Sequence, residues 1–493
     1  MSDIYDLELM LRSSVPIIVV ETHEEARILK LFTKLAIGLF RPLFKWSITE
    51  GLQRLDIDYP SQSHNSDPGT VISHIKSTTT KSGIYLLLDF HPYLDDPILI
   101  RKLREVALAQ EEMGSTVVLI SHTVDIPQEI RKQCARFKLD LPGKKDLTKM
   151  VTNMARKWAA NNPGRKVRAN KRTLDLLVNN LSGLTMTDAI RLAKNAIYDD
   201  GAITEEDLPN IMEAKYKLFG DNGVLTYEKD TAKFSDVAGL THLKKWLQQR
   251  SKAFHSTSDT KNLDKPKGIM LLGVQGCGKS LAARSVAGVW GIPLLRLDFG
   301  ALYNKFIGET EKNLREALKT ANTMAPCVLW IDEIEKGVSR EENDSGVSRR
   351  ILGTLLTWMS DENNGVFIVA TANDITALPP ELIRKGRLDE IFFVDLPDTD
   401  TRIEILKVHL VKRNLDYKKY NIKKLAQVSA GFSGSELEQA IVSSLYSAHA
   451  DDSDLTTEHI YNELKRTRPL SVVMKEKIDE LRKWAASRTV LAN

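Results

Sequence analysis

Short runs of consecutive apolar residues alternate along this chain with longer segments whose apolar positions recur every three to four residues. Runs of this length are typical of buried strands, and the longer periodicity is typical of amphipathic helices. The pattern therefore predicts an α/β fold, with parallel sheets covered by helices. The strand candidates are residues 16–20, 84–89, 116–121, 268–273, 294–298, 327–332, 366–370 and 391–394.

The two halves of the chain repeat these features in the same order, which indicates a tandem duplication of an α/β module with a helical lid. The matching segments are residues 84–89 with 327–332, 117–130 with 369–382, 139–142 with 394–397, and 181–185 with 432–436. We expect five parts: a first α/β module (1–142), its helical lid (143–222), a linker with an entry motif (223–260), a second α/β module (261–398), and a second lid with a C-terminal helix (399–493).

The amino-acid composition argues against a disulfide-rich or membrane-spanning protein. Of the 493 residues, 42% are hydrophobic and 27% are charged, which is typical of an ordinary globular chain. The three cysteines, Cys134, Cys277 and Cys327, are too few and scattered for a disulfide framework, and a structural zinc site is not expected. No apolar run approaches the roughly 20 residues of a membrane span, and no signal peptide is expected from the N-terminal residues.

Residues 273–280 read Gly-Val-Gln-Gly-Cys-Gly-Lys-Ser and fit the phosphate-binding pattern G-x-x-x-x-G-K-[ST] between a strand and a helix. Glycines allow the backbone amides to turn toward phosphate oxygens, and the helix N-terminus adds partial positive charge. We expect Lys279 to reach the β- and γ-phosphates and Ser280 to bind Mg²⁺, so the predicted ligands are ATP and Mg²⁺. The predicted contacts are Gly273, Gln275, Gly276, Cys277, Gly278, Lys279, Ser280 and Leu281.

Acidic and amide side chains follow the next strands. Asp332 and Glu333 end the strand at residues 327–332, where Asp332 is placed to hold Mg²⁺ and Glu333 to polarise a water for attack on the γ-phosphate. Asn373 follows another strand and is predicted to contact that water and the γ-phosphate, although capping a turn is an alternative role.

Three segments together resemble the AAA ATPase clade that contains proteasomal ATPases, membrane AAA proteases and hexameric segregases. They are residues 234–239, 378–389 and 431–435, within a resemblance that covers residues 234–450. The resemblance implies a homo-hexameric ring in which Arg384 and Arg387 act as arginine fingers on the neighbouring subunit's nucleotide. The alternative for these arginines is pairing with nearby surface acids. The resemblance also implies contacts to the base and ribose from Asp236, Val237, Gly239, His409, Gly434 and Ser435.

Residues 304–309 resemble the first pore loop of that clade, in which Lys305, Phe306 and Ile307 would grip an extended polypeptide. Burial in the core is the alternative for Phe306, because phenylalanine is usually buried. Residues 335–350 are polar and are consistent with a second pore loop.

The first module lacks the chemistry of the second. Its first strand is followed by Glu-Thr-His-Glu-Glu at residues 21–25, which has no glycine or lysine and would repel phosphate. By sequence matching, Asp89 corresponds to Asp332, Phe90 replaces the catalytic glutamate and Ser121 stands in place of Asn373. We therefore predict that this module does not hydrolyse ATP.

A basic stretch lies in the predicted lid of the first module, where residues 143–172 carry ten Lys or Arg and one acidic residue. Contact with a nucleic acid or an anionic surface is one interpretation, and a solvated helix face is the other, which we favour. The net charge of +4 gives the whole chain no strong preference for polyanions.

The layout of the whole chain resembles a family of AAA proteins encoded in cyanobacteria and algal plastids as a conserved hypothetical chloroplast reading frame. That resemblance implies a cytoplasmic or plastid-stromal location and a connection with photosynthesis or inorganic-carbon use. The expected function is an ATP-hydrolysing ring that remodels or threads a protein substrate, delivered directly or by an adaptor. The alternatives are a slow nucleotide-gated scaffold or regulator and a nucleic-acid remodeller.

Overall fold

A computed structural model of the chain describes residues 2–57, 65–78, 82–165, 167–204, 206–219, 223–229, 231, 237–255, 264–303, 310–338, 346–360, 365–384 and 386–493. The chain forms two compact units, which are described separately. The first unit is Met1–Asp146 with Leu184–Arg191, and the second is Leu147–Gly183 with Leu192–Asn493. No helix among the described residues is long and apolar enough to cross a bilayer.

The first unit contains a six-stranded sheet with the order β3-β2-β4-β5-β1-β6. All neighbouring strands are parallel except β2 and β3, which form an antiparallel pair. The strands are β1 (Ile17–Glu21), β2 (Leu43–Ser47), β3 (Gly51–Arg54), β4 (Ile84–Leu88), β5 (Thr116–Ser121) and β6 (Cys134–Phe137). The helices are α1 (Ser2–Arg12), α2 (Glu25–Leu39), α3 (Pro68–Ser77), α4 (Pro97–Leu108) and the short α5 (Gln110–Met113).

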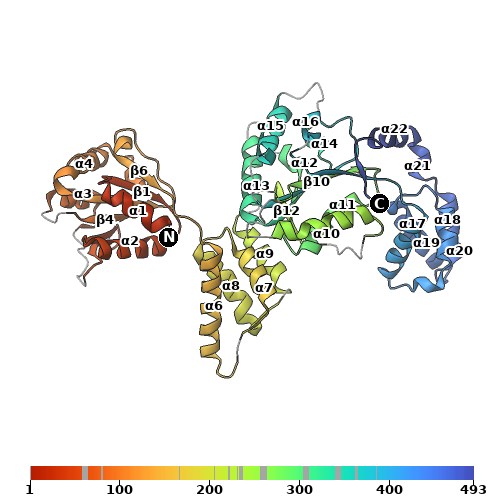
Figure 1. Cartoon of the computed structure of the whole chain (residues 1–493), viewed down its shortest axis with the longest axis horizontal. Helices are drawn as coiled ribbons and strands as arrows, with labels where there is room; N and C mark the ends of the chain where they lie inside the picture. The colour runs from red at the N-terminus through yellow and green to blue at the C-terminus, as the bar shows by residue number, and fades with distance from the viewer. Residues whose placement is uncertain are drawn as a thin grey trace. The chain divides into compact units, whose positions relative to one another are not determined.

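Both faces of this sheet are covered by helices, as the burial of nearly every residue in its central strands requires. Leu7 of α1 and Phe32 of α2 pack with Ile18 and other residues on one face. Helices α3 and α4 pack on the other face, against residues such as Tyr85 and Leu87 (Figure 1).

The second unit contains a seven-stranded sheet with the order β15-β14-β10-β13-β12-β11-β9, in which only the β9–β11 pair is antiparallel. The strands are β9 (Leu225–Glu228), β10 (Gly268–Gly273), β11 (Leu294–Leu297), β12 (Cys327–Ile331), β13 (Val366–Ala372), β14 (Glu390–Val394) and β15 (Val490–Leu491). Apolar residues of α10 (Thr241–His255) and α11 (Lys279–Trp290) cover one face. The other face packs on α12 (Phe299–Tyr303), α13 (Thr310–Met324) and α15 (Val347–Ser360), with α14 (Glu335–Val338) and α16 (Pro380–Ile383) nearby in the chain.

The five central strands have the same spatial order in both sheets. The order β2-β4-β5-β1-β6 in the first corresponds to β11-β12-β13-β10-β14 in the second. This equivalence confirms the predicted α/β class with tandem modules. All eight strand candidates are strands in the structure, with limits that differ by at most two residues. In these two sheets, the edge strands β3, β6, β9 and β15 were not predicted, and neither was β2, whose apolar pattern is interrupted by a lysine and a serine.

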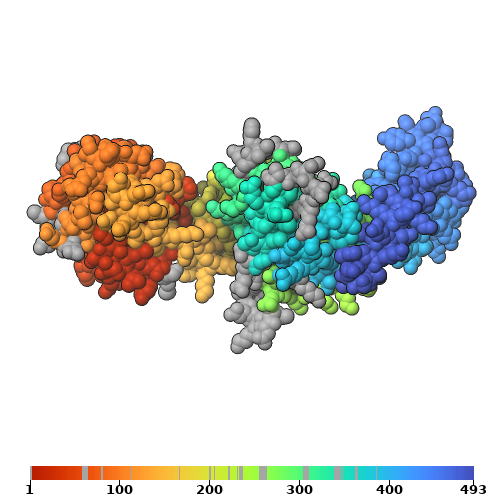
Figure 2. All heavy atoms as spheres, turned by 90° about the horizontal axis from the view of Figure 1, so that it is seen from above, coloured from red at the N-terminus to blue at the C-terminus, as the bar shows by residue number. Residues whose placement is uncertain are grey.

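The remaining elements are mostly helical. Helices α6 (Lys144–Asn161), α7 (Lys171–Leu181), α8 (Met186–Asp200) and α9 (Asp207–Leu218) accompany a two-stranded sheet of β7 (Arg168–Ala169) and β8 (Ala202–Ile203). Four of the C-terminal helices share an apolar core of their own and form a lobe, drawn in lighter blue in Figure 2. They are α17 (Thr399–Val411), α18 (Ile422–Val428), α19 (Gly434–Ala450) and α20 (Thr457–Arg466). The short α21 (Leu470–Val473) follows, and Leu481 and Ala485 of α22 (Lys475–Ala485) join the core of the seven-stranded sheet.

Candidate nucleotide site

The loop between β10 and α11 follows a path that requires glycine. At Gly273, a Cβ atom would lie 2.0 Å from the carbonyl oxygen of Val394 in the adjacent strand β14. At Gly276, where φ is 77°, a Cβ atom would lie 2.2 Å from the hydroxyl of Ser435 at the start of α19. The Ser435 amide also donates a hydrogen bond to the Gly276 carbonyl at 3.0 Å. The loop is therefore held by a strand on one side and by the C-terminal helices on the other.

Lys279 begins α11 and is almost fully buried, with 6% of its surface exposed. Its Nζ donates hydrogen bonds to the carbonyl oxygens of Gly273 and Val274, at 2.8 and 2.9 Å. Burial lowers the pKa of Lys279 to about 8, while the neighbouring acids partly oppose that shift. A phosphate group beside this ammonium would favour its charged form and raise the pKa again.

Binding of MgATP near pH 8 should therefore be accompanied by net uptake of protons by Lys279. The charged lysine is the form that attracts phosphate. The affinity for MgATP should therefore reach its full value well below pH 8 and should fall as the pH rises through this value. Calorimetric titrations in two buffers with different protonation enthalpies measure the uptake directly. Uptake near zero at pH 8, or affinity that increases from pH 8 to 9, would contradict the assignment.

A hydroxyl and a carboxylate from different elements meet beside the phosphate loop. The Ser280 hydroxyl lies 3.4 Å from Oδ1 of Asp332, and the Thr371 hydroxyl donates a hydrogen bond of 2.6 Å to the same oxygen. Thr371 lies near the end of β13, next to the end of β12. Oxygen ligands of this kind suit Mg²⁺, which usually keeps several of its waters and takes few protein ligands. Ser280 and Asp332 fit the predicted magnesium site.

Glu333 is held in a strained backbone conformation with φ of 49°. Its Oε1 accepts a hydrogen bond of 2.9 Å from the side-chain amide of Asn373, and Lys336 forms an ion pair with the same carboxylate. The backbone amide of Asn373 donates to Glu335 at 2.9 Å, and burial raises the pKa of Glu335. Asn373 thus positions the carboxylate that was predicted to polarise water, in addition to lining the cavity itself.

These groups line one cavity of about 460 Å³, large enough for a nucleotide. The apolar side chains of Val237, Ile405 and Val408 also line it, together with His409. Nδ1 of His409 lies 3.3 Å from Glu438, and burial is the main reason that the pKa of His409 is lowered. The combination of the phosphate loop with apolar side chains from α17 suits a nucleotide whose base lies among the C-terminal helices.

Most of the predicted nucleotide contacts that the structure describes line this cavity. They are Val237, Gln275, Gly276, Cys277, Gly278, Lys279, Ser280, Leu281, Asp332, Glu333, Asn373, His409, Gly434 and Ser435. Gly273 does not line the cavity, but its carbonyl oxygen accepts the hydrogen bond from Lys279. Gly239 lines a neighbouring cavity with Thr401 and Glu404. Asp236 and the predicted pore-loop residues Lys305, Phe306 and Ile307 lie outside the described residues, as do residues 339–345 of the second candidate pore loop.

Several residues that line the cavity were missed from the sequence. Ala238, Thr371, Ile405, Val408, Lys412 and Glu438 belong to this group. His409, like positions 237 and 435, was predicted from the family resemblance. Ile405 lies four residues before it and Lys412 three residues after it, so helical spacing could have indicated both.

Cys277 also lines the cavity, and burial raises the pKa of its thiol to about 12. Because the thiolate is the reactive form, Cys277 is expected to react slowly with thiol reagents near neutral pH.

Arg384 and Arg387 do not line the cavity of their own chain. Arg384 is exposed, and Arg387 donates a hydrogen bond to the carbonyl oxygen of Glu381. Asp389, one of the nearby acids, accepts hydrogen bonds from the backbone amides of Lys267 and Gly268, at 2.7 and 3.0 Å.

The corresponding loop of the first module has no glycine and joins β1 to α2 through only three residues. Glu24 is buried there, and its carboxylate accepts hydrogen bonds from Arg27 at 2.8 Å and from the amide of Met186 at 2.5 Å. A buried carboxylate at the start of α2 occupies the place where phosphate would bind.

The basic stretch of the predicted lid is solvent-facing where it is helical. In α6, Leu147, Val151 and Trp158 are buried, whereas Lys145, Lys149, Arg156 and Lys157 are exposed. This arrangement is that of an amphipathic helix with a solvated basic face.

Comparison with known proteins agrees with this geometry. The model of the ATPase family associated with various cellular activities (AAA) matches residues 269–396, and models of the N-terminal and second domains of SpoVK-like AAA ATPases match residues 4–139 and 145–222. The AAA domain-containing protein ycf46 of Guillardia theta is 36% identical over 99% of this chain and 96% of its own length.

Two further relatives match less than half of this chain. A cell division cycle protein 48 homologue of Archaeoglobus fulgidus is 33% identical over 43% of this chain and 30% of its own length. A proteasome-activating nucleotidase of Pyrococcus abyssi is 32% identical over 44% of this chain and 56% of its own length.

Proposed function

This chain belongs to the family of the AAA domain-containing protein ycf46, and from this premise we propose that it is a ring-forming ATPase that remodels or threads a protein substrate. The observation that carries the proposal is the cavity in which Lys279, the Ser280–Asp332 pair and the Glu333–Asn373 pair converge. Lys279 would neutralise phosphate charge and Glu333 would accept a proton from the attacking water. Mg²⁺ held by Ser280 and Asp332 would supply further charge neutralisation.

The ring is part of the proposal because no arginine of the same chain lines the cavity among the residues that the structure describes. In-line hydrolysis is greatly accelerated when a guanidinium group approaches the γ-phosphate. Arg384, exposed outside the cavity, would supply this group to an adjacent subunit, and Arg387 would assist. We include in the proposal a homo-hexamer and a cytoplasmic or plastid-stromal location, with a link to photosynthesis or inorganic-carbon use.

Measuring phosphate release over a range of protein concentrations, together with imaging of particles with a slowly hydrolysed ATP analogue, tests the ATPase and the ring together. Specific activity should rise with concentration, and rings should form with the analogue. Full activity in a dilute monomer would refute the shared site. Slow turnover in rings without any substrate effect would instead favour the nucleotide-gated regulator.

Threading is tested by Phe306→Ala, because a pore aromatic would contact the substrate and not the nucleotide. Substrate-stimulated activity should be lost while basal ATP hydrolysis is retained, and Phe306→Tyr should preserve both. Stimulation by an unfolded model protein is the measurement. Unchanged stimulation in Phe306→Ala would exclude a grip at this position.

A nucleic-acid function remains the disfavoured alternative. Binding of DNA or RNA that weakens steeply with salt, and that is lost when Lys145, Lys149, Arg156 and Lys157 are neutralised, would support it over the protein-remodelling proposal.

A further inference from the structure

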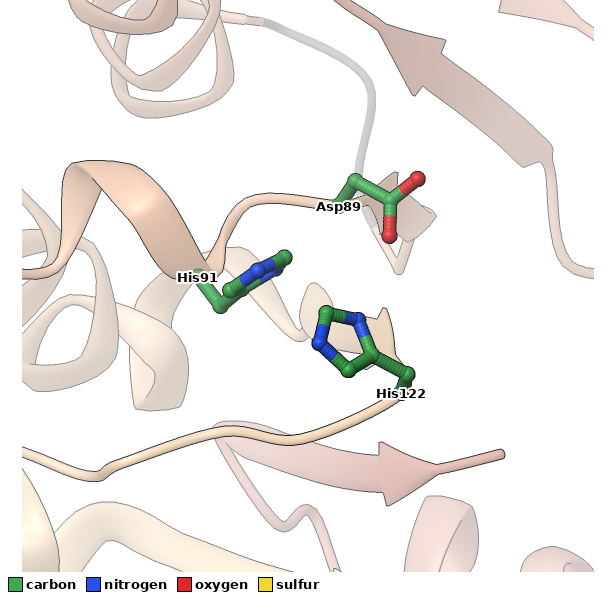
Figure 3. A group of neighbouring side chains, drawn as sticks. All are labelled: Asp89, His91 and His122. Atoms are coloured by element: carbon green, nitrogen blue, oxygen red, sulfur yellow. The ribbon is translucent and has the colours of Figure 1, made fainter. Parts of the chain in front are cut away.

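Three metal-ligand side chains meet in the first module, at the edge of the sheet where strands β4 and β5 end. Asp89 and His91 follow β4, and His122 follows β5. One potential ligand atom from each lies within 4.8 Å of the other two. In Figure 3 the carboxylate of Asp89 and the rings of His91 and His122 converge on one space.

The backbone shows which part of the second module this corner corresponds to. Asp89 and Glu333 both have left-handed conformations, with φ of 48° and 49°, and a helical turn begins two residues later in each case, at His91 and Glu335. Asp89 is therefore the structural counterpart of Glu333, and not of Asp332 as sequence matching indicated.

The strand registers extend this correspondence to β5. Continuing the β4–β5 pairing places Asp89 opposite Ser121, and continuing the β12–β13 pairing places Glu333 opposite Ala372. His122 is then the counterpart of Asn373, which corrects the earlier match of Ser121 with that residue. The positions of Glu333, Glu335 and Asn373 in the second module are thus occupied in the first by a carboxylate and two imidazoles.

On this basis, we infer that the first module binds a divalent transition-metal ion through Asp89, His91 and His122. Imidazole and carboxylate groups suit ions such as Zn²⁺, whereas Mg²⁺ has little affinity for imidazole. Ligand atoms arranged tetrahedrally at about 2.1 Å from such an ion are about 3.4 Å apart. Asp89 and His122 are exposed, so rotation of these side chains can close the observed spacing around an ion.

A hydrogen bond already orients one of the ligands. Nδ1 of His91 lies 3.1 Å from the hydroxyl of Ser121, which is only 2% exposed. When Nδ1–H donates to this hydroxyl, Nε2 carries the lone pair that a metal requires. Metal-bound histidines commonly use their second nitrogen in this way. Ser121 is therefore a positioning residue for His91.

The site has room for a further ligand. Three protein ligands leave at least one coordination position open, as in metal sites that bind water or an exogenous molecule. His23 follows β1 and stacks on His122, with ring centroids 6.0 Å apart. It is not one of the three converging ligands.

Titration of the untagged, chelator-treated, nucleotide-free full-length protein with Zn²⁺ tests the inference. One tight equivalent per chain should bind in excess Mg²⁺, and the imidazole NMR signals of His91 and His122 should shift. His91→Ala and His122→Ala should each weaken binding by at least about 100-fold, since loss of a residue that only orients a ligand costs 10–100-fold. Ser121→Ala should give that smaller loss.

The matched control is His449→Ala, which removes an exposed histidine from α19 in the other unit and should leave Zn²⁺ affinity unchanged. Circular dichroism checks that each variant is folded. Equal Zn²⁺ binding by the wild-type protein and the His91→Ala/His122→Ala double variant would overturn the inference. Displacement of the bound ion by Mg²⁺ would also overturn it, because a site that depends on imidazole would not exchange in this way.

Discussion

Replacement of Glu333 by glutamine is expected to leave ATP bound while lowering its hydrolysis by about 10²–10⁴-fold, the usual contribution of a positioned general base. Glutamine has nearly the same size, and its amide oxygen can still accept the 2.9 Å hydrogen bond from Asn373. It cannot take a proton from the attacking water. Binding of a fluorescent ATP analogue and release of phosphate, measured on the same preparation, separate the two effects.

Glu480→Gln provides the matched control, since this exposed glutamate lies on α22 and does not line the cavity. It should hydrolyse ATP at the wild-type rate. If Glu333→Gln hydrolysed ATP within a few-fold of that rate, the general base would have to be sought elsewhere, and Glu335 would be the next candidate because its carboxylate also faces Asn373.

Loss of an arginine finger should have an effect of similar or greater size. Arg384→Ala and Arg387→Ala are each expected to lower hydrolysis by up to about 10³–10⁵-fold, the range for a finger that stabilises the transferring phosphoryl group. Nucleotide affinity should change little in a single subunit, because neither side chain lines its own cavity. Phosphate release and analogue binding are again the measurements, and Arg468→Ala, at an exposed site between α20 and α21, is the control.

Mixing two inactive variants shows whether the finger acts on a neighbouring subunit. Lys279→Ala should not bind ATP but retains both arginines, whereas Arg384→Ala retains the whole cavity. Mixed rings should regain activity at interfaces that join an intact cavity to an intact finger. Failure to regain activity, although the two variants assemble together, would show that Arg384 does not act across the interface.

The phosphate loop could be predicted from the sequence because its chemistry depends on a short contiguous segment. Gly276, Lys279 and Ser280 lie within five residues, and the local strand–loop–helix pattern is enough to place them. The eight buried strands could also be predicted from the sequence, since parallel strands covered on both faces are apolar along most of their length. The edge strands could not be found in this way, because β9 and β15 are short and partly or wholly exposed.

Long-range packing explains why some residues of the cavity and the cluster in the first module could not be predicted from the sequence. Thr371 contacts Asp332, and Glu438 contacts His409, only because strands and helices far apart in the chain are adjacent in space. The three side chains of the first-module cluster were also present in the sequence. Their grouping and their correspondence with Glu333, Glu335 and Asn373 depend on strand register, and a shift of one residue in a strand exchanges the residues on its two faces. Local pattern was thus sufficient for the class of fold and the phosphate chemistry, whereas the pairing of distant strands was needed to reveal the second cluster.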